Sequence, residues 1–219
     1  MPTNTARAWR REFHELAFRT VFELAGAAGE YGQWIAYRLY FGWLFRRADP
    51  WRYASSAYEL EKYQRTLGTL RGLHATRVLE AGCAEGAFTE LFMRHAAGCE
   101  ILGVDVSEAA LVRARQRCRA YPGAHFARAN LAFQAPDGPF DLIICAEVLY
   151  YMGARSVNAC AILTDRLAPH ARLVAVHPAD RADALHAPWY ADPRLVFEQR
   201  VRGESEGRPY VIDLFSRVG

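Results

Sequence analysis

The chain has 219 residues, of which 52% are hydrophobic and 23% charged, a composition typical of one globular domain and not of a disordered chain. Its 27 basic and 24 acidic residues leave a formal charge of only +3, whereas proteins that bind nucleic acid through its phosphates carry a denser, clustered positive excess. Composition therefore argues against nucleic acid as a partner. Lys62 is the only lysine among the basic residues, a bias that we attribute to the base composition of the coding DNA.

The five cysteines lack the CxxC spacing that zinc sites favour, and their odd number does not suit a disulfide framework. They are expected to be small core residues in a reducing compartment, with no metal site. The N-terminal residues do not form a secretory signal, and no uncharged apolar stretch reaches the roughly 20 residues of a membrane span. We therefore expect a cytoplasmic protein with no integral membrane span.

Two regions of the chain differ in character. Residues 1–72 are rich in aromatic residues and predict helices, whereas residues 73–219 alternate apolar runs with helix-like stretches, as βαβ units do. Strands are predicted over residues 77–81, 99–105, 124–129, 140–146, 172–177, 195–200 and 210–215, and helices over residues 87–97, 107–121 and 155–168. Because the last two strands form a hairpin, the expected sheet is mostly parallel with an antiparallel C-terminal edge.

Three helices are predicted in the N-terminal region: one through Phe13–Leu24, one over Tyr31–Phe45, and one from Ser56 towards Leu70. Ser56 is expected to form a capping box with Glu59. The apolar second helix is compatible with packing on the main domain or in a homodimer contact, with binding at a membrane surface, or with a lid over a substrate pocket.

The first predicted strand ends in the turn Glu80-Ala-Gly-Cys-Ala-Glu-Gly86, and a helix follows at once. In an open α/β sheet this edge binds ligands, and glycine lets a ligand approach the backbone closely. The dinucleotide motif GxGxxG would need glycine at three positions, but Ala84 and Ala87 stand at two of them. An acidic Glu80 also suits a cationic group better than phosphates, so the turn argues against a nicotinamide oxidoreductase.

Polar residues follow the next strands at the same edge. Asp105 is positioned to accept both ribose hydroxyls of an adenosine, or otherwise assists Ser107 at the start of a helix. Asn130 has an amide for an adenine edge, although asparagine is also an ordinary turn residue. Glu147 follows an apolar strand, where it could orient an amine or take its proton; a solvated carboxylate at a helix start is the alternative.

Together, the Glu80–Gly86 turn, Asp105 and the segment Phe140–Met152 resemble the class I S-adenosylmethionine (SAM)-dependent methyltransferases. More narrowly, the strings Glu80-Ala-Gly-Cys-Ala-Glu-Gly-Ala-Phe-Thr-Glu90, Ala146-Glu-Val-Leu-Tyr-Tyr151 and Asp49-Pro50-Trp51-Arg52 resemble the nodulation protein S family. The resemblance implies a Rossmann-like, seven-stranded SAM-binding catalytic domain over residues 73–219 and a helical cap over residues 1–72. Members of that family N-methylate a free amino group on a chito-oligosaccharide.

The same resemblance implies where a SAM cofactor would bind. Its methionine part would lie against the glycine-containing turn, its ribose against Asp105, its adenine beside Asn130, and its sulfonium near aromatic rings of the cap. The implied cofactor contacts are Glu80, Gly82, Cys83, Ala84, Gly86, Asp105, Val106, Asn130, Leu131 and Ala146, with Trp51, Tyr58 and Tyr63 from the cap.

Methyl transfer from a sulfonium mainly requires alignment, exclusion of water and a proton acceptor. We predict Glu147 as the main proton acceptor, His177 as a second candidate base unless it is simply hydrogen-bonded at a loop edge, and Tyr150 as a hydroxyl that orients the small-molecule acceptor. A methyltransferase for hydroxyl or carboxyl groups, and a non-catalytic domain that binds SAM or a partner protein, remain alternatives. The expected loop 178–192 carries four residues that could stack on a ring or cover the sheet edge, His186, Pro188, Trp189 and Tyr190.

Overall fold

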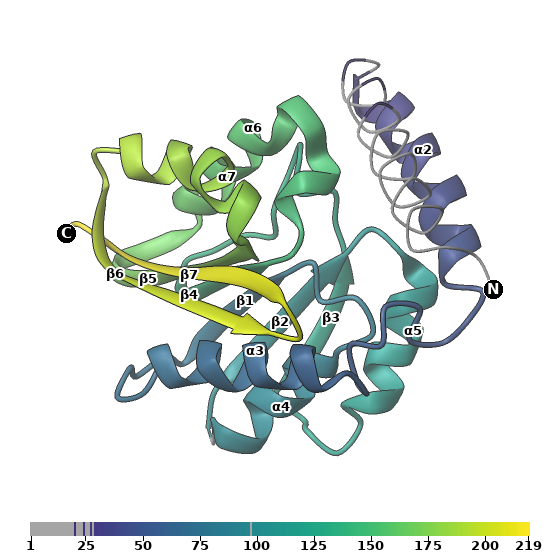
Figure 1. The fold of residues 1–219 in the computed structure, drawn as a ribbon, viewed down its shortest axis with the longest axis horizontal. Helices are drawn as coiled ribbons and strands as arrows, with labels where there is room; N and C mark the ends of the chain where they lie inside the picture. The colour runs from purple at the N-terminus through teal and green to yellow at the C-terminus, as the bar shows by residue number, and fades with distance from the viewer. Residues whose placement is uncertain (1–19, 21–23, 25–26, 28, 97) are drawn as a thin grey trace.

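One seven-stranded sheet organises the computed structural model, which describes residues 20, 24, 27, 29–96 and 98–219 (Figure 1). Its spatial order is β3-β2-β1-β4-β5-β7-β6. The strands are β1 (Arg77–Ala81), β2 (Glu100–Asp105), β3 (Ala124–Arg128), β4 (Phe140–Ala146), β5 (Leu167–Pro178), β6 (Leu195–Ser205) and β7 (Arg208–Arg217). β7 pairs antiparallel with both β5 and β6, and the other pairs are parallel. The predicted mostly parallel sheet with an antiparallel edge hairpin is confirmed.

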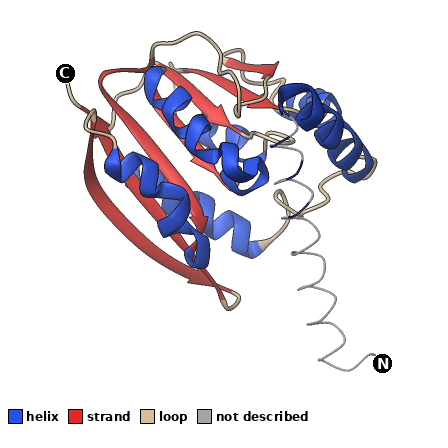
Figure 2. Ribbon diagram, turned by 90° about the horizontal axis from the view of Figure 1, so that it is seen from above, coloured by secondary structure: helices blue, strands red, loops and turns tan. Residues whose placement is uncertain are grey.

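Helices cover both faces of the sheet, which explains the continuous apolar runs of its central strands (Figures 1 and 2). The helical elements are α2 (Gly29–Leu44), α3 (Ala57–Thr69), α4 (Ala87–His95), α5 (Glu108–Arg117), the 3-10 segment η1 (Leu149–Arg155), α6 (Ser156–Asp165) and α7 (Ala179–Ala191). One core cluster joins η1, α6 and α7 to one sheet face, and a second joins α3 and α4 to the other. All five cysteines are buried as free thiols, the core role predicted for them.

The N-terminal region agrees with the sequence predictions in part. The second predicted helix is α2, and the third is α3. Ser56 does stand at the N-cap of α3, but its side chain makes no capping hydrogen bond, so the expected capping box is wrong. Glu59 instead is buried and lies 2.9 Å from the ammonium of Lys62. The predicted helix through Phe13–Leu24 falls outside the described residues except at positions 20 and 24.

The expected loop after the fifth strand is wrong, because residues 179–191 form the helix α7. Pro188 near the end of this helix reads as a loop signal in the sequence. The buried residues Ala182, His186 and Trp189 nevertheless follow helical spacing along it. Among the described residues, no helix combines the length and the apolar character needed to cross a lipid bilayer.

Asp141 ties the starting ends of β1 and β4 together. Its Oδ2 accepts hydrogen bonds from the backbone N–H and hydroxyl of Thr76 and from the backbone N–H of Arg77, at 2.9, 2.6 and 2.9 Å. The bond from the Thr76 hydroxyl is the main reason that the pKa of Asp141 lies below its usual value.

We therefore expect Asp141→Ala to lower the free energy of unfolding by about 1–3 kcal/mol, because three donors lose a charged acceptor. A lowered pKa means that this contribution is present above pH about 4 and is lost as the pH falls further. Urea denaturation at pH 7 and pH 3 measures both effects. Asp137→Ala, which removes the same charge from a fully exposed side chain, is the control; equal midpoints for the two variants at pH 7 would contradict the assignment.

Candidate active site

A pocket of about 910 Å3, its open mouth included, lies at the carboxyl ends of β1, β2 and β4 under residues of the N-terminal region. Four acidic side chains line it, those of Glu59, Glu80, Asp105 and Glu147, and none of the described lining residues is Lys, Arg or His. The pocket is therefore acidic, with apolar and aromatic groups over most of its remaining wall.

The turn after β1 is wound through left-handed backbone conformations. Gly82, Ala84 and Gly86 have φ angles of +78°, +46° and +73°. A side chain at Gly82 would bring its Cβ to 2.7 Å from Val148 Cγ2, so glycine is required there for space as well as for conformation. Gly86 stands at the N-cap of α4 and is not among the residues that line the pocket.

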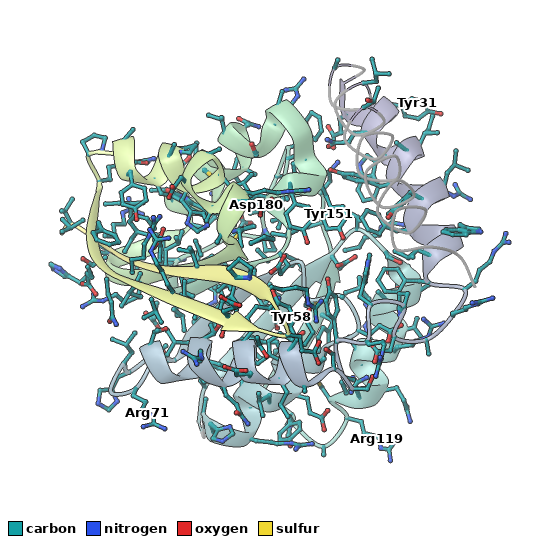
Figure 3. The ribbon with its side chains drawn as sticks, in the orientation of Figure 1. Tyr31, Tyr58, Arg71, Arg119, Tyr151 and Asp180 are labelled. Atoms are coloured by element: carbon teal, nitrogen blue, oxygen red, sulfur yellow. The ribbon has the colours of Figure 1, made fainter. Side chains whose placement is uncertain are left out.

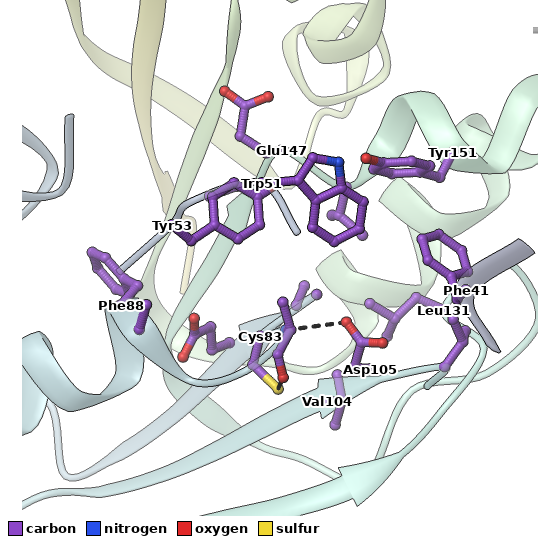
Figure 4. Close-up of a pocket in the computed structure, with 18 of the residues that line it drawn as sticks. Phe41, Trp51, Tyr53, Cys83, Phe88, Val104, Asp105, Leu131, Glu147 and Tyr151 are labelled. Carbon is purple, nitrogen blue, oxygen red and sulfur yellow. Dashed lines mark hydrogen bonds between the residues drawn. The ribbon is translucent and has the colours of Figure 1, made fainter. Parts of the chain in front are cut away.

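Two carboxyl groups at the strand ends have raised pKa values because burial disfavours their charged forms. Burial raises the pKa of Glu80 to about 8, although the Thr89 hydroxyl donates to it. Burial also raises the pKa of Asp105 to about 6, opposed by backbone N–H groups. Ser107 N donates to Asp105 Oδ1 at 2.8 Å. Ala84 N donates to Asp105 Oδ2 at 3.1 Å, the bond that a dashed line marks in Figure 4. The carboxylate of Asp105 is thus held rigidly at the pocket wall.

The side chain of Asn130 is engaged by the N-terminal region. Its Nδ2 donates to Gln33 Oε1 on α2 at 3.1 Å, and its Oδ1 accepts from Ala132 N at 3.2 Å. The amide predicted for an adenine edge is therefore bonded to Gln33 here, while Asn130 and the neighbouring Leu131 still line the pocket.

Glu147 stands where β4 leaves the sheet, in a left-handed conformation with φ +54°. Its Oε1 accepts from the ammonium of Lys62 at 2.8 Å, and its Oε2 accepts from the hydroxyl of Tyr150 at 3.0 Å. Lys62 is only 2% exposed and also pairs with Glu59. Burial alone would lower the pKa of Lys62, but the two carboxylates outweigh it and hold the pKa above its usual value. A lysine from α3 therefore fixes the carboxylate predicted as the proton acceptor.

Aromatic rings form the outer wall of the pocket. Trp51 and Tyr53 stack with their ring centroids 5.3 Å apart, and Phe41 packs edge-on against Tyr151 at 5.3 Å. In Figure 4 the rings of Trp51 and Tyr53 stand across the pocket from Cys83 and Asp105. The hydroxyl of Tyr37 on α2 donates to the backbone carbonyl of Tyr151 at 3.0 Å, which joins the aromatic wall to η1.

The pocket brings together most of the residues predicted to contact a cofactor. Those on its lining are Trp51, Tyr63, Glu80, Gly82, Cys83, Ala84, Asp105, Val106, Asn130, Leu131 and Ala146, with Glu147 beside them. Sequence reasoning missed Glu59 and the aromatic residues Tyr37, Phe41, Phe45, Tyr53 and Tyr151. The aromatic density of residues 31–53 was a signal for the first four of these rings.

Four predicted residues are not on the lining: Gly86, Tyr58, Tyr150 and His177. Tyr150 reaches the site only through its hydroxyl, which donates to Glu147. Tyr58, labelled in Figure 3, packs edge-on against Tyr210 with ring centroids 5.9 Å apart. The guanidinium of Arg208 lies over the ring of Tyr58. His177 is completely buried, and burial holds its pKa well below the usual value. His177 does not line the pocket, so its position does not support the prediction that it acts there as a base.

In the segment predicted as a loop Trp189 is buried, whereas Tyr190 is 43% exposed. The indole N–H of Trp189 donates to the carbonyl of Cys160 at 3.2 Å, and the hydroxyl of Tyr190 donates to Asp213 Oδ2 at 2.9 Å. His186 is completely buried. None of these three is among the residues that line the pocket, so the structure does not place them where they could stack on a ligand bound there.

Comparisons with known proteins agree with this geometry. Nodulation protein S of Sinorhizobium fredii is 37% identical over 130 residues, which are 58% of this chain and 59% of that protein. A trans-aconitate 2-methyltransferase of Delftia acidovorans is 33% identical over 115 residues, 51% of this chain and 41% of that protein. The crystal structure of the N-methyltransferase NodS from Bradyrhizobium japonicum in complex with S-adenosyl-L-homocysteine matches with a TM-score of 0.73 and 26% identity, over 82% of this chain and 97% of that one.

The chain spans less than two thirds of the length of these curated relatives. The sequence profile described as Nodulation protein S (NodS) matches residues 44–182, more than half of the chain, and this range contains the Glu80–Gly86 turn, Asp105, Lys62 and Glu147. The chain therefore belongs to the Nodulation protein S family.

Proposed function

We propose that this chain is a SAM-dependent methyltransferase that transfers a methyl group to an amine of a small molecule, an amino sugar or a related metabolite. The observation that carries the proposal is the charge of the pocket: four carboxyl groups line it and no described lining residue is basic. The one ammonium behind the wall, that of Lys62, pairs with two of these carboxylates, so the wall keeps a negative excess. A sulfonium donor and an amine acceptor are both compatible with such a wall. A polycarboxylate acceptor such as trans-aconitate would meet repulsion there.

The residues of the pocket fit SAM as the donor, which supplies an electrophilic methyl group when bound. The rigid carboxylate of Asp105 would accept hydrogen bonds from the ribose hydroxyls, and the turn from Glu80 to Ala84 would receive the amino-acid part. The faces of Trp51 and Tyr53 would attract a sulfonium through their ring quadrupoles. Support comes from the related NodS structure, which contains S-adenosyl-L-homocysteine (SAH).

Glu147 would act on the acceptor. An amine must lose a proton to attack, and a carboxylate close to the acceptor nitrogen can take it directly or through a water. Lys62 and Tyr150 hold the two oxygens of Glu147, so that its carboxylate keeps one orientation. We also propose that residues 1–72 act as a cap over the catalytic domain of residues 73–219, because α2 and the segment that follows it supply the aromatic wall.

Paired acceptors test the reaction class. The chain is incubated with methyl-labelled SAM and, separately, with a chito-oligosaccharide that has one free amino group, the same oligosaccharide fully N-acetylated, and trans-aconitate. We expect label only on the free amine, identified by mass spectrometry as an N-methyl group. Labelling of trans-aconitate or of a sugar hydroxyl would favour the O-methyltransferase alternative, and SAH binding without any transfer would favour the non-catalytic one.

Asp105→Asn tests the donor site. Loss of the charged acceptor is expected to raise the Kd for SAH roughly tenfold or more, measured by calorimetry. Because the pKa of Asp105 is about 6, the affinity of the unaltered protein should fall as the pH is lowered through 6, and the variant should lack that step. Asp137→Asn is the matched surface control. Equal Kd values for SAH in Asp105→Asn and the control would remove Asp105 from the site.

Glu147→Gln tests the proton acceptor. The amide keeps the shape of the side chain but cannot take a proton, so we expect the turnover number to fall tenfold or more while the Kd for SAH stays nearly unchanged. Glu61→Gln on the exposed side of α3 makes the same chemical change away from the pocket. A variant at position 147 as active as this control would defeat the assignment.

A further inference from the structure

Three buried side chains connect the antiparallel edge of the sheet to the turn that carries Glu147. Asp213 on β7 accepts from His186 Nδ1 on α7 at 2.7 Å, and His186 Nε2 lies 2.8 Å from His177 Nδ1 at the end of β5. His177 Nε2 in turn lies 3.3 Å from the backbone nitrogen of Leu149. Asp213, His186 and His177 are all completely buried. The polar atoms of these side chains therefore find their hydrogen-bond partners in one another and not in water.

The groups at the two ends of this hydrogen-bonded series determine which ring nitrogens of His177 and His186 carry a proton. Arg200 donates to both oxygens of Asp213, each at 2.7 Å. Burial alone would raise the pKa of Asp213, but Arg200 and His186 lower it to about 2, so the carboxylate only accepts. The backbone N–H of Leu149 at the other end only donates. Nε2 of His177 must therefore be a bare acceptor, and both His177 and His186 must carry their protons on Nδ1.

Leu149 N–H belongs to the strained turn that points Glu147 into the pocket. Glu147 has φ +54°, a conformation that persists in a non-glycine residue only when its surroundings enforce it. Its own backbone N–H donates to the carbonyl of Val176 at 2.9 Å, and Leu149 N–H is bonded to His177. Two consecutive residues at the end of β5 thus hold the turn on both sides of Val148.

Tyr150 is the third point of contact. Its ring packs edge-on against His177 with centroids 6.0 Å apart, while its hydroxyl donates to Glu147 Oε2. The imidazole of His177 therefore touches both the backbone and the ring that determine where the carboxylate of Glu147 lies. The charged and titratable groups that act on His177 are Lys62 from α3, His186 from α7 and Asp213 from β7.

We propose that Asp213, His186 and His177 position Glu147 and Tyr150 for methyl transfer. Their hydrogen bonds form a relay in the sense that each one fixes the tautomer of the next ring, and no proton moves along it. His177 is thereby a positioning residue and not a base. Its kinetic consequence rests on the proposed function, whereas the proton positions do not.

The proton positions are tested on the unaltered protein with 15N-labelled histidine. Long-range 1H–15N spectra should show the proton on Nδ1 in both His177 and His186. The ring of His177 should stay neutral between pH 6 and 8, unlike solvent-exposed histidines, which titrate near pH 6.5. The signals of His177 are assigned from a His177→Gln variant. A proton on Nε2 of His177, or titration of its ring in this range, would overturn the relay.

The positioning role is tested with a pair of variants. His177→Phe keeps a ring but removes the acceptor, and His177→Gln places an amide oxygen within reach of Leu149 N–H. We expect the Phe variant to lose hydrogen-exchange protection at the Leu149 amide and to lower the turnover number at least tenfold with an unchanged Kd for SAH. The Gln variant should retain protection and at least fivefold more turnover than the Phe variant.

Equal exchange and equal turnover for the two variants would overturn the positioning role. Thermal unfolding of both variants identifies a general loss of structure, and the spectra of the unaltered protein remain decisive if either variant fails to fold. If the unaltered protein methylates no amine, the proposed function fails, while the proton positions and the exchange protection are still measured.

Discussion

The ammonium of Lys62 connects the two parts of the candidate site. It comes from α3 in the N-terminal region, and it lies within 2.9 Å of Glu59 on its own helix and of Glu147 beyond β4. A buried ammonium is costly unless carboxylates compensate it. The packing of α3 on the sheet and the orientation of Glu147 therefore depend on each other: neither can change without leaving a charge unpaired in the protein interior.

Whether a buried charge has a partner also accounts for the pKa values of the other carboxyl groups in the pocket. Glu80 and Asp105 have raised pKa values because they are buried, and within the described part of the chain neither has a basic partner. Glu147 is paired with Lys62. A cationic ligand would supply the missing partner for the first two and favour their ionised forms. The fold thus supplies a positive partner for the carboxylate of Glu147, whereas a bound cationic ligand would have to supply one for Glu80 and Asp105.

The sequence predicted the features that depend on local pattern. β4 is a continuous apolar run and has the predicted bounds, Phe140–Ala146, and Asp105 ends β2 beside the turn, as parallel strands require. The role of Lys62 could not be predicted, because it depends on a partner 85 positions away. The same holds for His177, whose environment is made by β7 and α7. The expected capping box failed because Glu59 is drawn into that ion-pair cluster and not to the end of its helix.

The burial of Lys62 also has a chemical consequence for the surface. Lys62 is the only lysine of the chain, so no other ε-amino group is available to reagents that acylate amines. Apart from the amino terminus, such a reagent finds its single target only when α3 separates from Glu147. The rate at which Lys62 is acylated thus reports how often α3 separates from Glu147, and any molecule that holds the two together should slow the labelling.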